Sequence, residues 1–359
     1  MESPKKKRKI NTVVRILIVF LLIAVYGISV YLTLVPYVET EFQSWKARHE
    51  AEGFAKGATD IENSYKDTLE YPITGYKRML KKTGVIISEK DLVLDYGASG
   101  ELEHADLLAD MIDYNERIYL EDQNTLSDAW TYKTNDFDVK KYGLDDGIVG
   151  VLDIPSMGVS FPLRLGGSDY NMATGVAQLS GTSMPIGGIN TNCVIVGHRG
   201  WINGGKFLKD IEMVEVGDVV TLTNLWYPME YKVVEIKIIY PNDIDEIRID
   251  PGKDLLSIVT CHPYGTGGRY YRYVLVCERV PFKQMEVSEK YEWVDEPYTN
   301  VEKEKLDLVN MPKVVYFSSE KEIVIDDVIH RIGCVLAVGV PILAIVLAVL
   351  SRRRSKRRG

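Results

Sequence analysis

The chain has 359 residues, of which 46% are hydrophobic and 26% charged, and its formal net charge is -8. This length and apolar content are sufficient for one folded core with accessory segments. The chain contains only four cysteines, which excludes a disulfide framework for a protein of this size. No closely spaced pattern of cysteine and histidine indicates zinc, and we expect neither a metal nor an organic cofactor.

Basic residues are concentrated at the two ends of the chain. Residues 1–15 contain six basic residues and one acidic residue, and residues 351–359 contain six basic residues and no acidic one. Directly inside these ends lie uncharged apolar runs at 16–38 and 332–350, each near the ~20 residues that cross a bilayer. Cytoplasmic flanks are rich in Lys and Arg, so we predict two transmembrane helices, with both termini cytoplasmic and residues 39–329 outside the cell.

Two other interpretations of the N-terminus were weighed. A cleaved signal peptide is disfavoured because the apolar run is long and no clean small-residue cleavage site follows it. The basic stretch Pro4–Lys9 resembles a nuclear import signal, but the apolar run directly behind it favours a membrane flank. We therefore expect the lipid bilayer as a partner and no nucleic acid.

The segment after the first apolar run is charged and has a mostly helical pattern. Residues 39–120 are predicted to form an extracellular helical segment, with breaks near Gly57, Pro72 and Gly75. Residues 121–145 lack a clear periodicity and are predicted to form a long loop.

The composition changes in residues 146–285, where short β-rich runs alternate with Gly, Asn and Pro turns. This pattern predicts an all-β core, either a barrel or a sandwich. Residues 286–329 are acidic and are predicted to link this core to the second transmembrane helix, at 330–350. The predicted strands are Ile148–Ile154, Cys193–Val196, Val219–Leu222, Tyr231–Tyr240, Ser257–Thr260 and Tyr273–Val276.

Three side chains in this core could carry out acyl transfer. Cys261 ends one predicted strand and Arg272, eleven residues later, begins the next, so we expect them to face each other across the mouth of a hairpin. His198 follows another predicted strand. A thiolate can attack a carbonyl carbon, an imidazolium can protonate the leaving amine, and a guanidinium can hold the oxyanion.

At these motifs the chain resembles the sortases, specifically the pilus-assembling class C. The resemblance implies a closed β-barrel in which Cys261 is the nucleophile, His198 the general acid and base, and Arg272 the oxyanion-binding group. It also implies cleavage of a sorting signal between Thr and Gly and transfer of the acyl group to an amine. The substrates would be pilins or surface proteins with C-terminal sorting signals. The matching segments are Tyr114–Arg117, Asp153–Pro155, Gly181–Gly188, Gly197–Gly200, Thr260–Cys261 with Pro263–Gly265, and Arg272–Arg279.

Class C sortases have a lid over the active site that carries an Asp-Pro-aromatic motif. Here the predicted loop contains Asp128-Ala129-Trp130, in which Ala129 replaces the proline. The resemblance implies that Asp128 pairs with Arg272 and that Trp130 covers Cys261. The alternative is an exposed loop with an incidental tryptophan. Because proline restricts a loop, the alanine is expected to make this lid looser.

Some assignments stay open at this stage. Counting forward from the cysteine favours Arg269, whereas alignment to the following strand favours Arg272. His262 departs from the Thr or Ser usual in the family, and its neighbouring position in the strand is expected to point it away from the thiol. Cys193 and Cys277 lie in apolar runs and are expected to be buried, with a disulfide between them as the alternative.

Two rival functions are also kept. The first is a sortase that anchors surface proteins to a cell-wall precursor, because the lid and second span do not reveal the acceptor. The second is a non-catalytic surface-binding module built on the same barrel, against which the intact cysteine, histidine and arginine argue.

Overall fold

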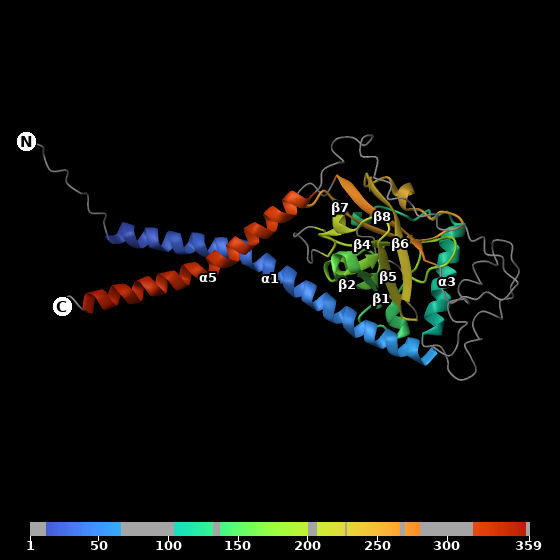
Figure 1. Ribbon diagram of the computed structural model, residues 1–359, viewed down its shortest axis with the longest axis horizontal. Helices are drawn as coiled ribbons and strands as arrows, with labels where there is room; N and C mark the ends of the chain where they lie inside the picture. The colour runs from blue at the N-terminus through green and yellow to red at the C-terminus, as the bar shows by residue number, and fades with distance from the viewer. Residues whose placement is uncertain are drawn as a thin grey trace, which may run out of the picture. The chain divides into compact units, whose positions relative to one another are not determined.

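Eight strands form a closed barrel in the computed structural model, which describes residues 12–65, 104–131, 137–199, 207–226, 228–265, 270–280 and 319–356 (Figure 1). Their order around the barrel is β1-β2-β3-β4-β7-β8-β6-β5, and β5 pairs with β1 to close it. The β2–β3 and β4–β7 pairs are parallel and the others are antiparallel. The strands are β1 Ile148–Ile154, β2 Val159–Leu165, β3 Val176–Gln178, β4 Thr191–Val196, β5 Val219–Asn224, β6 Pro228–Ile239, β7 Asp254–His262 and β8 Tyr271–Arg279.

The predicted all-β core is thereby confirmed as a closed barrel, and each of the six predicted strands corresponds to an observed one. Two strands, β2 and β3, were missed. Pro162 lies inside β2 and argues against a strand because it has no N–H to donate, yet pairing with β3 begins only at Leu163. β3 has three residues, too few for a detectable alternation.

Helices pack against the barrel through small or apolar residues. Helix α3, Ala105–Leu120, buries Leu107, Met111 and Ile118, which recur at helical spacing. Its polar face also contacts the barrel: Asn115 Oδ1 accepts a hydrogen bond from the N–H of Met184 at 2.6 Å, and the Tyr114 hydroxyl accepts one from Gly181 at 3.2 Å. Tyr114 and Asn115 therefore form hydrogen bonds with the Gly181–Gly188 segment, and both segments are among those that resemble the sortases.

Helix α1 is one continuous helix, Thr12–Tyr65. Its residues from Thr40 onward belong to the same compact unit as the barrel, and there Ala47 and Ala51 are buried and Glu50 forms a 2.8 Å ion pair with Arg164. The break expected near Gly57 is absent, because the helix runs through it. The breaks expected at Pro72 and Gly75 lie outside the described residues.

A second unit contains the first part of α1, to Glu39, and α5, Glu320–Lys356, from Glu322 onward. In the described part of the chain, Glu320–Val346, with 27 residues, is the one helical stretch long and apolar enough to cross a membrane. The apolar stretch in α1 is shorter, Val19–Tyr31. Its side chains are exposed, as Phe20 at 70% shows, which is unusual unless such a surface is covered by another apolar phase.

Short helical segments occupy the connections between these elements. They are η2 Ala129–Thr131, η3 Val139–Tyr142, η4 Pro155–Met157, α4 Asp169–Ala173, η5 Ile211–Met213 and η6 Ile244–Ile247. The predicted loop 121–145 therefore contains two short 3-10 turns, η2 and η3, and residues 132–136 within it lie outside the described residues.

Candidate active site

Cys261 and Arg272 are direct partners in the antiparallel β7–β8 pair. Both strands end at this edge of the barrel, with the cysteine one residue before the end of β7 and the arginine one residue after the start of β8. Residues directly opposite in an antiparallel pair have neighbouring side chains. Arg272 Nη1 accordingly lies 4.0 Å from Cys261 Sγ. Arg269, the alternative arginine, lies outside the described residues.

His198 reaches the cysteine from the other side of β7, through the parallel pairing with β4. That register pairs Val196 with Val259, and two hydrogen bonds continue it past the end of β4: Gly197 N–H to Val259 O at 3.3 Å and Thr260 Oγ1 to Gly197 O at 2.7 Å. The next residues in step are His198 and Cys261. Adjacent strands lie about 4.8 Å apart, so this register places the backbone of His198 beside that of Cys261.

The thiol is poorly ionised in this arrangement. The pKa of Cys261 is raised to about 12, mainly by burial; the Arg272 and Arg199 guanidinium groups oppose this rise and the Asp128 carboxylate adds to it. Because only the thiolate is nucleophilic, this raised pKa disfavours attack by Cys261. A change that removed Asp128 while leaving Arg272 in place would favour the thiolate.

The imidazole has one carboxylate within reach. Burial lowers the pKa of His198, while Asp169 at the start of α4 raises it. The distance from His198 Nε2 to Asp169 Oδ1 is 3.9 Å, and the histidine is 7% exposed. Asp169 therefore favours the imidazolium form, which is the form that can donate a proton to a leaving amine.

Asp128 and Trp130 both contact Arg272. The guanidinium donates from Nε to Asp128 Oδ1 at 2.9 Å and from Nη2 to Oδ2 at 2.8 Å, a two-pronged geometry that suits a carboxylate. The Trp130 ring centroid lies 4.2 Å from the guanidinium carbon. This segment thus occupies the donors that an oxyanion would need, next to the thiol.

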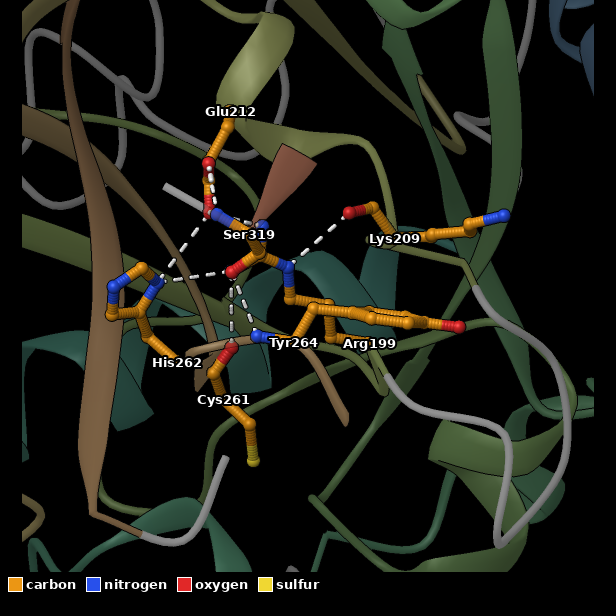
Figure 2. A network of polar contacts seen from close by, with 7 residues as sticks. All are labelled: Arg199, Lys209, Glu212, Cys261, His262, Tyr264 and Ser319. Atoms are coloured by element: carbon orange, nitrogen blue, oxygen red, sulfur yellow. Dashed lines mark hydrogen bonds and ion pairs between the residues drawn. The ribbon is translucent and has the colours of Figure 1, made fainter. Parts of the chain in front are cut away.

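A buried polar network lies on the other side of the cysteine backbone (Figure 2). Arg199 is 1% exposed and contacts His262 Nδ1 at 3.1 Å, Glu212 Oε1 at 2.5 Å and the Cys261 carbonyl at 3.5 Å. Sequence reasoning missed Asp169, Arg199 and Glu212. The position next to His198 was the one available sign for Arg199, and no pattern marks the other two.

The remaining cysteines take no part in this site. The disulfide considered between Cys193 and Cys277 is absent, because both thiols are free. Cys193 on β4 and Cys277 on β8 both pair with Leu256 on β7, from opposite sides. They are therefore two strand spacings, or about 10 Å, apart, which is too far for a disulfide. Among the described residues, no group of three or more His, Cys, Asp or Glu is arranged to hold a metal ion.

Comparison with known proteins identifies the barrel. Residues 152–280 match the sortase domain family. Sortase D of Bacillus subtilis is 27% identical over 132 residues, which is 36% of this chain and 63% of that protein, so the chain spans less than two thirds of that relative.

Among solved structures, the chain is similar to sortase C-1 from Actinomyces oris, at 30% identity and a TM-score of 0.42, covering 50% of this chain and 99% of that one. Sortase C1 of Streptococcus agalactiae is 26% identical with a TM-score of 0.46, covering 54% and 96% of the two chains. The matched residues contain most of the barrel strands and the cysteine, histidine and arginine just described, and the chain belongs to the sortase family of cysteine transpeptidases.

Proposed function

We propose that this protein is a pilus-type sortase, a membrane-anchored transpeptidase that cleaves a Leu-Pro-x-Thr-Gly-like signal between Thr and Gly. One observation carries the proposal: Cys261 on β7 lies between His198, in step on the β4 side, and Arg272, its partner on β8. All three residues lie at the same edge of a barrel whose sequence matches the sortase domain.

The proposed reaction has two acyl transfers. The Cys261 thiolate attacks the threonine carbonyl carbon, and Arg272 donates hydrogen bonds to the oxyanion. The Thr–Gly amide bond breaks as the His198 imidazolium gives its proton to the leaving glycine nitrogen, which leaves a thioester. An incoming amine then attacks the thioester, the neutral imidazole accepts its proton, and the thiolate is released.

The pilin lysine as acceptor is the finer part of the proposal. It is supported by the contacts of Asp128 and Trp130 with Arg272, because a lid that pairs with the arginine is a class C feature in the resemblance described above. A covered site excludes water, which would otherwise hydrolyse the thioester before an amine arrived.

Anchoring by two membrane spans is also proposed. It is supported by the length and hydropathy of α5 and by the exposed apolar side chains of the first part of α1. Within the same unit, the Tyr26 hydroxyl donates to the Ala337 carbonyl at 2.5 Å, a contact that would satisfy a polar group between two helices in lipid. The basic residues beyond each helix give both termini a cytoplasmic location.

The test uses the full chain in detergent micelles with a fluorescent Leu-Pro-x-Thr-Gly peptide. Wild type should release the glycine-side product and accumulate a Cys261 thioester that mass spectrometry detects, and Cys261→Ala should do neither. An added lysine peptide should accelerate turnover more than an amine that mimics a cell-wall precursor. Product release by the Cys261→Ala protein at the wild-type rate would exclude this mechanism, and absence of any cleavage by wild type would favour a non-catalytic module.

A further inference from the structure

The buried network behind Cys261 joins the catalytic strand to the residue that precedes α5. Figure 2 shows the cysteine with its carbonyl facing the network and its sulfur pointing away from it. Successive side chains of a strand point to opposite faces, so His262 lies on the network side while Cys261 lies on the reactive side. The network therefore contacts the cysteine through its backbone, and the Arg199 charge also lowers the pKa of the thiol.

Arg199 is the centre of this network. Its Nε donates to the Lys209 carbonyl at 3.2 Å, its Nη1 lies 3.5 Å from the Cys261 carbonyl, and its Nη2 meets Glu212 at 2.5 Å. It also directly follows His198 in the chain. One guanidinium thus ties the backbone of the proposed nucleophile to the backbone next to the proposed acid.

His262 supplies an acceptor that fixes the guanidinium. An arginine can only donate, so the Nδ1 atom that faces it must carry a lone pair, and the ring is neutral with its proton on Nε2. Burial and, to a lesser extent, the Arg199 charge lower the pKa of His262 to about 4 against the opposing effect of Glu212, so the ring stays neutral at physiological pH.

Glu212 connects Arg199 to Ser319. Burial alone would raise the pKa of Glu212, but Arg199 and the N–H of Ser319 more than offset this, and the pKa lies below its usual value. The Ser319 N–H donates to the carboxylate at 3.0 and 3.3 Å, and the Ser319 hydroxyl accepts from the N–H of Tyr264 at 2.8 Å. Ser319 is fully buried and immediately precedes α5.

We propose that Glu212 and Ser319 are positioning residues for the active site: they hold Arg199, and Arg199 holds Cys261 and His198 in step. The inference rests on the proposed catalytic functions of Cys261 and His198. It gives Ser319, the residue before α5, a role in catalysis. A catalytic strand that loses this support keeps its thiol but loses its alignment, and a misplacement of about 1 Å can lower turnover by on the order of 100-fold.

The test compares full-chain variants in detergent by kcat, KM and thermal unfolding. Glu212→Ala should lower kcat on the order of tenfold while KM changes less than about twofold, because substrate binding is untouched. Glu212→Gln, which keeps an acceptor, should lose less. Ser319→Ala should lower kcat by several-fold, and Ser319→Thr, which keeps the hydroxyl, should restore it. Glu246→Ala removes an exposed ion pair with Lys237 and serves as the matched control, with kinetics unchanged.

A second readout needs no substrate and separates the two proposals. The rate of Cys261 alkylation, measured from pH 6 to pH 11, should be altered in Glu212→Ala and Ser319→Ala and unaltered in Glu246→Ala. If wild type cleaves no peptide, the proposed function fails, while alkylation still tests the positioning role. If folded Glu212→Ala and Ser319→Ala match wild type in both kcat and alkylation, the positioning role is wrong. If Glu212→Ala does not fold, the isosteric Glu212→Gln change decides the question, because it removes the charge that pairs with Arg199, and wild-type kcat and alkylation in that variant would overturn the positioning role.

Discussion

Removing the contacts between the lid residues and Arg272 should activate the enzyme. The double change Asp128→Ala, Trp130→Ala deletes a two-pronged charge-assisted pair between side chains that are 18% and 6% exposed, and a ring 4.2 Å from the guanidinium. The pair contributes about 1.5–3 kcal/mol and the ring about 0.5–2 kcal/mol. A combined ~3 kcal/mol corresponds to about a 100-fold shift toward the open state.

The same change acts on the thiol itself. Asp128 raises the pKa of Cys261 and Arg272 lowers it, so loss of the aspartate should bring the pKa below its value of about 12. Below the pKa, each unit of decrease gives tenfold more thiolate at fixed pH. We therefore expect alkylation by iodoacetamide at pH 7.5 to rise by at least about tenfold, and its pH midpoint to move toward neutrality.

The assay follows alkylation by intact mass and peptide cleavage by fluorescence on the same preparations. Asp128→Asn keeps an acceptor but loses the charge, so it should fall between wild type and the double variant. Glu121→Ala, an exposed change in the same segment, is the control and should leave both rates unchanged. Equal alkylation rates in wild type and a folded double variant would show that this segment does not gate the thiol.

Three further results are expected. Replacement of His198 or Arg272 by alanine should each lower peptide turnover by at least ~100-fold, as for other acid–base and oxyanion groups, and a loss under about fivefold would contradict the role. Asp169→Asn removes the charge that raises the pKa of His198, so the acidic midpoint of the pH–rate profile should move to lower pH; an unmoved midpoint would exclude this coupling. In intact cells, a membrane-impermeant thiol probe should label cysteines introduced in 286–329 and not in 351–359, and labelling of the basic tail would refute a cytoplasmic C-terminus.

The parts of the site that sequence could predict are those set by local pairing. Cys261 and Arg272 are eleven residues apart on neighbouring antiparallel strands, so a hairpin with apolar arms and a glycine-rich turn was enough to bring them together. His198 is different, because the parallel β4–β7 register that aligns it cannot be read from either strand alone. Its assignment rested on the resemblance, and the register now gives the physical reason for it.

The contacts that sequence could not predict are those without periodicity or motif. Glu212 lies in a three-residue 3-10 helix and meets Ser319, 107 residues later, through a backbone N–H that any residue type could supply. The two missed strands also lack a local pattern. β3 is too short, and β2 contains a proline, whose missing N–H matters only if that position must donate to a neighbouring strand. Such features depend on tertiary packing that no local pattern encodes.

The raised pKa of Cys261 also bears on the chemical lifetime of the protein. Oxidation to sulfenic acid and beyond proceeds through the thiolate and requires access, as alkylation does. A thiol with a pKa near 12 is a poor target for peroxide. The proposed nucleophile is therefore protected from oxidation between encounters with substrate. It becomes vulnerable while the site is open.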